Sequence, residues 1–329
     1  MTAQKTHPWI TIGKNAISYF KVLLTLKRNC IRKFITNLDT LLNTNLMKKL
    51  LLIVLLITFS LNVSGQIKTP QPSPLAKIEQ KVGLTDVTLE YSRPSMRGRT
   101  IFGDLVPYGK QWRLGANANT KITFSTDVTI GEYNLKAGAY AIYVIPNETS
   151  WNVMFYNDAS NWGMPKEWDD SKVVAMVNAD IYPMPMKIET FTMTFDDLSS
   201  SSTTLGMLWE AVYVGVKIEV PTDNIVLTSI NDVMNATPTG NDYYAAAVYY
   251  LQEGKDIKQA KTWIDKAITM AGDKVAFWQL RQQSLIYAKA GDKKGAIAAA
   301  KKSLIASEAA GNADYVKMNK DSLMEWETK

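Results

Sequence analysis

The chain has few of the side chains that carry most acid–base and thiol chemistry, with one histidine, His7, and one cysteine, Cys30. A single cysteine excludes an internal disulfide, so packing must stabilise any fold. Both residues precede an apolar segment that is typical of a removable leader. If the leader is removed, imidazole bases, thiol nucleophiles and cysteine-type zinc sites are excluded as well.

The segment 47–65 has the three parts of a secretory signal peptide. It begins with a basic pair, continues with an apolar run up to Leu61, and ends with small residues before Gln66. The run is about a dozen residues long, shorter than the roughly 20 that a membrane span needs. We therefore predict cleavage before Gln66; the alternative is an uncleaved anchor.

This leader predicts where the working protein starts and where it resides. A signal peptide functions at the start of a chain, so we expect translation to begin at Met47 and residues 1–46 to be a mis-called extension. The protein is then exported to the periplasm or the extracellular space. No later segment is apolar enough to span a membrane, so we expect the cleaved protein to have no membrane-spanning segment.

The basic character of the chain is concentrated in this leader. Residues 1–65 hold nine of the 37 lysines and arginines and one of the 31 acids, Asp39. Residues 66–329 are left with 28 basic and 30 acidic side chains, a net charge of −2. Nucleic-acid binding needs clustered uncompensated cations, so we expect no nucleic-acid partner.

Residues 66–75 are rich in proline and predict an extended tether. Residues 76–220 predict an antiparallel β-sandwich or jelly-roll domain, because apolar and polar residues alternate in several short runs separated by turn residues. Residues 140–145 are apolar on both faces, as in a central strand. The alternating runs fall at 87–91, 122–124, 151–155, 191–195, 205–209 and 212–220.

Residues 221–329 predict an all-α domain, because alanine, lysine and glutamine replace β-branched residues. The expected helices cover 243–253, 257–271, 275–290, 293–309 and 314–326. Tyr250 and Gly254 recur 37 positions later, and Ala260 recurs 36 positions later as Ala296. This pattern resembles tetratricopeptide repeats and predicts protein binding, although two units fall short of the roughly three that a free array needs.

The segment 91–117, called the Arg loop below, is the densest candidate site. Arg93, Arg99 and Arg113 lie among aromatic residues, with Trp112 and Asn117 beside them. Guanidinium groups and indole rings can bind anionic or polyhydroxyl ligands by paired hydrogen bonds and stacking.

An alternative is that the Arg loop is structural. It would then close one end of the sandwich, with its arginines paired to Asp86, Glu90 or Asp104, because buried polar groups need partners.

At this point the chain resembles the domain-of-unknown-function family 2911, found in exported bacterial proteins, over about Pro74–Val220. The motifs that carry the resemblance are Tyr91–Pro94, Gly98-Arg99, Ile101–Gly103, Leu105–Gly109, Trp112-Arg113, Gly115–Asn117, Thr120, Ala137–Tyr140 and Trp209. The resemblance implies a β-rich exported domain, sometimes followed by helical repeats, and it supplies no activity.

Other polar and aromatic groups favour structural roles. Asp169-Asp170 and Asp196-Asp197 predict turns or caps, since neighbours on a strand face opposite ways. The oxygen-rich stretch 157–163 lacks the acids of a strong calcium site, so we expect no metal and no cofactor. Trp151, Trp162 and Trp168 could stack on a carbohydrate, but such residues more often fill a core.

We therefore expect a non-enzymatic envelope protein. Its β domain would bind a ligand through Arg93, Arg99, Trp112, Arg113 and Asn117, and its repeats would bind a protein. Two alternatives are a carboxylate-dependent glycan hydrolase and a purely structural assembly factor. No catalytic residue is identified by the sequence.

Overall fold

The computed structural model describes residues 24–38, 45–60 and 69–328. The chain divides at Pro70 into two units, which are treated separately. In the first unit, residues 24–38 and α2 (Asn45–Ser60) are helical. The apolar part of the predicted signal lies largely in α2, whereas His7 and the expected cleavage residues 63–66 lie outside the described residues. In the part of the chain that the structure describes, we find no helix with the length and apolarity for a membrane crossing.

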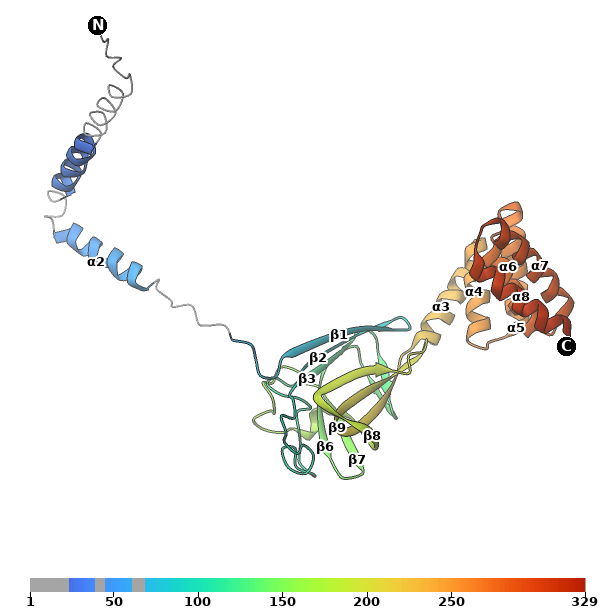
Figure 1. Cartoon of the computed structure of the whole chain (residues 1–329), viewed down its shortest axis with the longest axis horizontal. Helices are drawn as coiled ribbons and strands as arrows, with labels where there is room; N and C mark the ends of the chain where they lie inside the picture. The colour runs from blue at the N-terminus through green and yellow to red at the C-terminus, as the bar shows by residue number, and fades with distance from the viewer. Residues whose placement is uncertain (1–23, 39–44, 61–68, 329) are drawn as a thin grey trace, which may run out of the picture. The chain divides into compact units, whose positions relative to one another are not determined.

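The second unit starts with nine antiparallel strands (Figure 1), as predicted for the β region. The strands are β1 (Leu75–Val82), β2 (Thr85–Ser92), β3 (Thr120–Phe124), β4 (Val128–Ile130), β5 (Tyr133–Leu135), β6 (Gly138–Pro146), β7 (Ser150–Tyr156), β8 (Val173–Asp196) and β9 (Ser202–Glu219). Their order is β1-β2-β3-β6-β7-β8-β9-β4-β5. The doubly apolar segment becomes β6, which has neighbours on both sides.

One long strand, β8, joins the two layers of this sandwich. Its first part, up to Asp180, pairs with β7, and its second part, from Ile181, pairs with β9. The register shifts between Pro183 and Ile188, and strands that change sheets usually do so at such irregularities. The hydrophobic core fills the space between the layers with side chains from both, such as Leu89 of β2 and Phe191 of β8.

A second, smaller core lies on the opposite face of β6 and β7. Tyr143 and Tyr156 point there, and Met164 and Trp168 from the loop after β7 pack against them. The loop thereby covers the outer face of the central strands. This cover explains why β6 is apolar on both faces.

The helical region follows the last strand directly. Its helices are α3 (Thr222–Met234), α4 (Gly240–Gln252), α5 (Ile257–Ala271), α6 (Phe277–Lys289), α7 (Lys293–Ala309) and α8 (Ala313–Thr328). The sequence analysis missed α3 and predicted the others to within a few residues. Helix α4 packs on α5, α6 on α7, and α7 on α8.

The internal repeat is visible in the turns of the helical region. Gly254 and Gly291 both have positive φ, 62° and 79°. The next residue in each turn donates its N–H to the carbonyl of a tyrosine, Tyr250 or Tyr287, at 2.9 Å in both cases. The recurring Ala260 and Ala296 are fully buried. The repeat therefore corresponds to equivalent helix–turn–helix geometry.

Candidate functional site

Arg93 and Arg99 of the Arg loop donate hydrogen bonds mainly to backbone carbonyls and do not line an open pocket. Arg93 donates from Nε to the Phe191 carbonyl at 3.0 Å and from Nη2 to Thr192 Oγ1 at 2.7 Å. The Arg99 guanidinium donates to the carbonyls of Met96 and Ser95, at 2.9 and 2.7 Å. Both guanidinium groups thus tie the loop to itself and to β8.

Two of the three acids predicted as partners of the arginines pair with lysines instead, and no ion pair of the third, Asp104, is found among the described residues. Asp86 pairs with Lys81 at 2.6 Å, and Glu90 pairs with Lys121. The prediction that the arginines pair with Asp86 or Glu90 is therefore wrong. Carbonyl oxygens satisfy Arg93 and Arg99 instead.

The Arg loop also holds the last residues of the predicted tether. The guanidinium of Arg97 donates to the Pro72 carbonyl at 2.9 Å, Asn117 Nδ2 to that of Ser73 at 3.0 Å, and the backbone N–H of Arg93 to that of Pro74 at 2.9 Å. Residues 72–74 are consequently fixed on the β region rather than forming a free extended tether.

Trp112 belongs to the core. It is 8% exposed, and its ring stacks on that of Trp209 with a centroid distance of 5.7 Å. Trp151 and Phe191 contact it edge to face, and its indole N–H donates to the Gly115 carbonyl at 3.2 Å. The ring consequently has no free face for a ligand.

Arg113 differs from the other arginines. It is partly buried, and its Nε has no hydrogen-bond partner among the described residues. Its side chain passes under Gly163, where an added Cβ would lie 3.4 Å from Arg113 Cδ and from the Asn117 carbonyl oxygen. Arg113 and Asn117 therefore lie directly beneath the loop that carries Trp162.

Trp162 stands beside a groove with both polar and apolar lining residues, which we call the Trp162 groove. The groove has a volume of about 260 Å³. Its lining includes Glu90, Asn119, Lys121 and Trp162. Trp162 is 78% exposed, whereas Trp151 is fully buried and Trp168 packs over the outer face of β6 and β7. Neither Asn119 nor Lys121 was predicted. Lys121 alternates with apolar residues on β3 and indicates only a polar side of the strand, whereas Asn119 precedes β3 and is buried by contacts distant in sequence.

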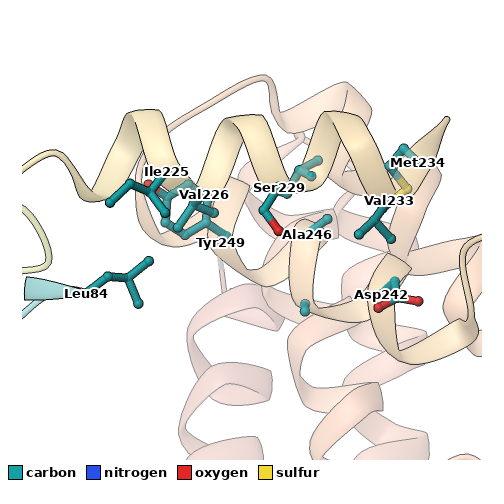
Figure 2. Close-up of a pocket in the computed structure, with 11 residues that line it drawn as sticks. Leu84, Ile225, Val226, Ser229, Val233, Met234, Asp242, Ala246 and Tyr249 are labelled. Carbon is teal, nitrogen blue, oxygen red and sulfur yellow. The ribbon is translucent and has the colours of Figure 1, made fainter. Parts of the chain in front are cut away.

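A second groove, the α3–α4 groove, is lined by α3, α4 and Leu84 of the turn between β1 and β2, and has a volume of about 390 Å³. Figure 2 shows side chains of α3, among them Val226, Ser229 and Val233, directed toward the helix that carries Ala246 and Tyr249. The lining is apolar apart from a few groups at its margins. Because α3 was not predicted, the sequence analysis gave no indication of this groove.

The adjacent carboxylates serve local structure. Asp169 caps a short 3₁₀-helix, Asp170–Lys172, by accepting from the Ser171 N–H at 3.0 Å, as predicted. Asp196 Oδ2 accepts from Thr194 Oγ1 and Tyr213 Oη, at 2.8 and 3.0 Å. Burial and this carboxylate raise the pKa of Tyr213 well above its usual range.

The oxygen-rich loop 157–163 uses its one carboxylate internally. Hydrogen bonds from Ser160 and the ion pair with Lys172, at 3.0 Å, hold the pKa of Asp158 well below its usual range. Within residues 24–38, 45–60 and 69–328, no three His, Cys, Asp or Glu side chains come close enough together to hold a metal ion.

Comparison with known proteins identifies the β region alone. Residues 73–218 match the model of a family described as "Protein of unknown function (DUF2911)". This match runs from just before β1 to the penultimate residue of β9 and includes the Arg loop. Neither the curated proteins nor the solved structures contain a significant match to the chain.

Proposed function

We propose that the protein is an exported, non-enzymatic binding protein whose helical region docks an amphipathic helix of a partner protein. The observation that carries this proposal is the α3–α4 groove. The helix–turn–helix units of the helical region resemble tetratricopeptide repeats, whose stacked helices are used for protein binding.

The apolar face of α3 supports a helical partner. Ile225, Val226, Ile230, Val233 and Met234 all line the groove, at the spacing of one helix face. Ile225 is 37% exposed, and none of these five side chains is fully buried. An apolar groove between two helices fits the apolar face of a third helix.

Charge around the groove favours a basic partner. Helices α3 and α4 together carry Asp223, Asp232 and Asp242 and no lysine or arginine. Asp223 pairs with Lys255 at 2.7 Å, and Asp232 is exposed. An amphipathic helix with lysine or arginine beside its apolar face would complement this surface.

The test uses a synthetic amphipathic peptide of leucine and lysine, about 18 residues long so that it spans several helical turns. Fluorescence anisotropy should show binding to the purified protein, and a scrambled peptide of the same composition should bind at least tenfold more weakly. Val226→Arg should abolish binding, because it places a cation and extra volume in the groove.

Ile305→Arg is the matched control, since Ile305 is a 68% exposed aliphatic side chain on α7. It should leave peptide binding unchanged. Equal binding of the scrambled peptide, or equal losses in both variants, would contradict the proposal.

Export is tested separately by N-terminal sequencing of the mature protein. We expect Gln66 as its first residue, since the small residues before it suit signal peptidase. A mature protein that keeps any residue before Gln66 would contradict cleavage at this site.

A further inference from the structure

We infer that the Trp162 groove of the β region binds an uncharged saccharide. This site is separate from the α3–α4 groove and uses none of its residues. The inference rests on an exposed ring, an oriented amide and a neutral pair of charges, all of which line one groove.

Trp162 supplies the ring. An indole that is 78% exposed gains nothing from burial in this chain, so packing within the protein does not account for it. Its loop is nevertheless held in place, because the buried Tyr143 hydroxyl donates to the carbonyl of the next residue, Gly163, at 3.0 Å. Gly163 has a φ of 78°, which favours glycine at this position. The flat apolar ring is thus presented by an anchored loop.

Asn119 supplies an oriented acceptor. Its side chain is 6% exposed, and Nδ2 donates to the same Tyr143 hydroxyl at 3.3 Å. This bond uses the amide nitrogen, and Oδ1 accepts no hydrogen bond from the described residues, so it can accept one from a ligand. Burial raises the pKa of Tyr143, so its hydroxyl keeps its proton and the chain from Asn119 to Tyr143 to Gly163 stays intact. One buried hydroxyl therefore positions both the acceptor and the loop of the stacking ring.

Glu90 and Lys121 determine the charge that the groove prefers. They are directly paired across β2 and β3 and form an ion pair whose side chains are 30% and 37% exposed. The groove thus offers a cationic donor and an anionic acceptor with no net charge. A free anion would meet the Glu90 carboxylate, whereas sugar hydroxyls can accept from Lys121 and donate to Glu90 and Asn119. A ring face for stacking together with mixed donors and acceptors matches an uncharged saccharide.

The experiment screens the purified protein against an array of neutral glucan, xylan, mannan and chitin oligosaccharides, with polygalacturonate as the anionic comparison. At least one neutral oligosaccharide should bind, and polygalacturonate should bind more weakly. For the best neutral oligosaccharide, titration calorimetry should show that Trp162→Ala raises Kd about tenfold, while Trp162→Phe loses less because it keeps a ring.

Trp278→Ala is the matched control, since Trp278 is a 46% exposed indole in the helical region. It should leave saccharide binding unchanged, and Trp162→Ala should leave binding of the amphipathic peptide unchanged. The inference is overturned if no neutral oligosaccharide binds, if polygalacturonate binds best, or if Trp162→Ala binds the neutral oligosaccharide as well as the unaltered protein does.

Discussion

The β region and the helical region bury different kinds of side chain. The largest fully buried residues of the second unit, such as Trp151 and Trp209, all lie in the β region. The helical region buries small residues at its helix contacts, with Ala260, Ala296 and Ser303 all at 0% exposure, and its fully buried larger side chains, Ile264 and Ile286, are aliphatic rather than aromatic. Large side chains of the helices, such as Trp278 and Met324, are 46% and 68% exposed.

This difference affects where each region leaves apolar surface exposed. Aromatic rings fill the core of the β region, so its candidate site, the Trp162 groove, is formed by a loop and strand residues outside that core. In the helical region, small residues let helices approach closely around Ile264 and Ile286, and other apolar side chains remain partly exposed, such as those that line the α3–α4 groove. The comparison makes three predictions about stability.

The largest expected effect is on the aromatic core. Trp209→Ala should lower the free energy of unfolding of the β region by about 3–5 kcal/mol, because it removes a buried ring and leaves a cavity. This loss can be measured by urea unfolding monitored with near-UV circular dichroism. The exposed Trp278 provides the control, since Trp278→Ala should change stability by less than about 0.5 kcal/mol. Similar losses in the two variants would remove the distinction between closed core and open helical surface.

A smaller effect is expected from adding volume between helices. Ala260→Leu should lower the free energy of unfolding of the helical region by about 1–3 kcal/mol, because the fully buried position has no room for a larger side chain. Far-UV circular dichroism during urea unfolding follows the helices. Ala309→Leu, at an exposed position of α7, should be nearly neutral. A neutral Ala260→Leu would mean that these helices are loosely packed.

The smallest expected effect is a loss of stability of the helical region at low pH, caused by Asp223 of α3. Hydrogen bonds from Lys255, at 2.7 Å, and Tyr249, at 2.9 Å, lower the pKa of Asp223 in the folded protein. The unfolded chain therefore takes up this proton first as pH falls past about 3.8, and stability declines toward the lower folded pKa. Asp223→Asn should reduce that acid-dependent loss of helical stability, measured by thermal unfolding across this pH range. Asp232→Asn on the same helix should not, and identical pH profiles for all three proteins would contradict the prediction.

The sequence predicted best those elements whose signals are local. The expected helices 257–271 and 293–309 coincide with α5 and α7, because aspartate caps at Asp256 and Asp292 and glycine turns mark their boundaries. Alternation predicts two runs, one on odd positions up to Trp209 and one on even positions from Val212. The structure joins them in one strand, β9, with Glu210 at a φ of 53° and an irregular register there. An extra residue at a bulge accounts for the change of phase.

The elements that were missed depend on contacts distant in sequence. The part of β8 before Phe191 lacks a clear alternation, and Pro183 and Pro185 lie near its middle, so only its pairing with β7 and β9 defines it. For the candidate site, the residue types of the Arg loop were identified, but their partners were not. Carbonyl acceptors such as those of Pro72 and Phe191 carry no signal in the sequence, and neither does the approach of Asn119 to Tyr143.

The shared strand β8 has a consequence for how the β region opens. Because its two parts are hydrogen-bonded into different sheets, detaching one sheet exposes the end of the other to solvent. Backbone amides of β7 and β9 should consequently exchange their protons with solvent through a common opening event, with similar protection in deuterium labelling. The sandwich would then behave as a single foldon despite its two layers.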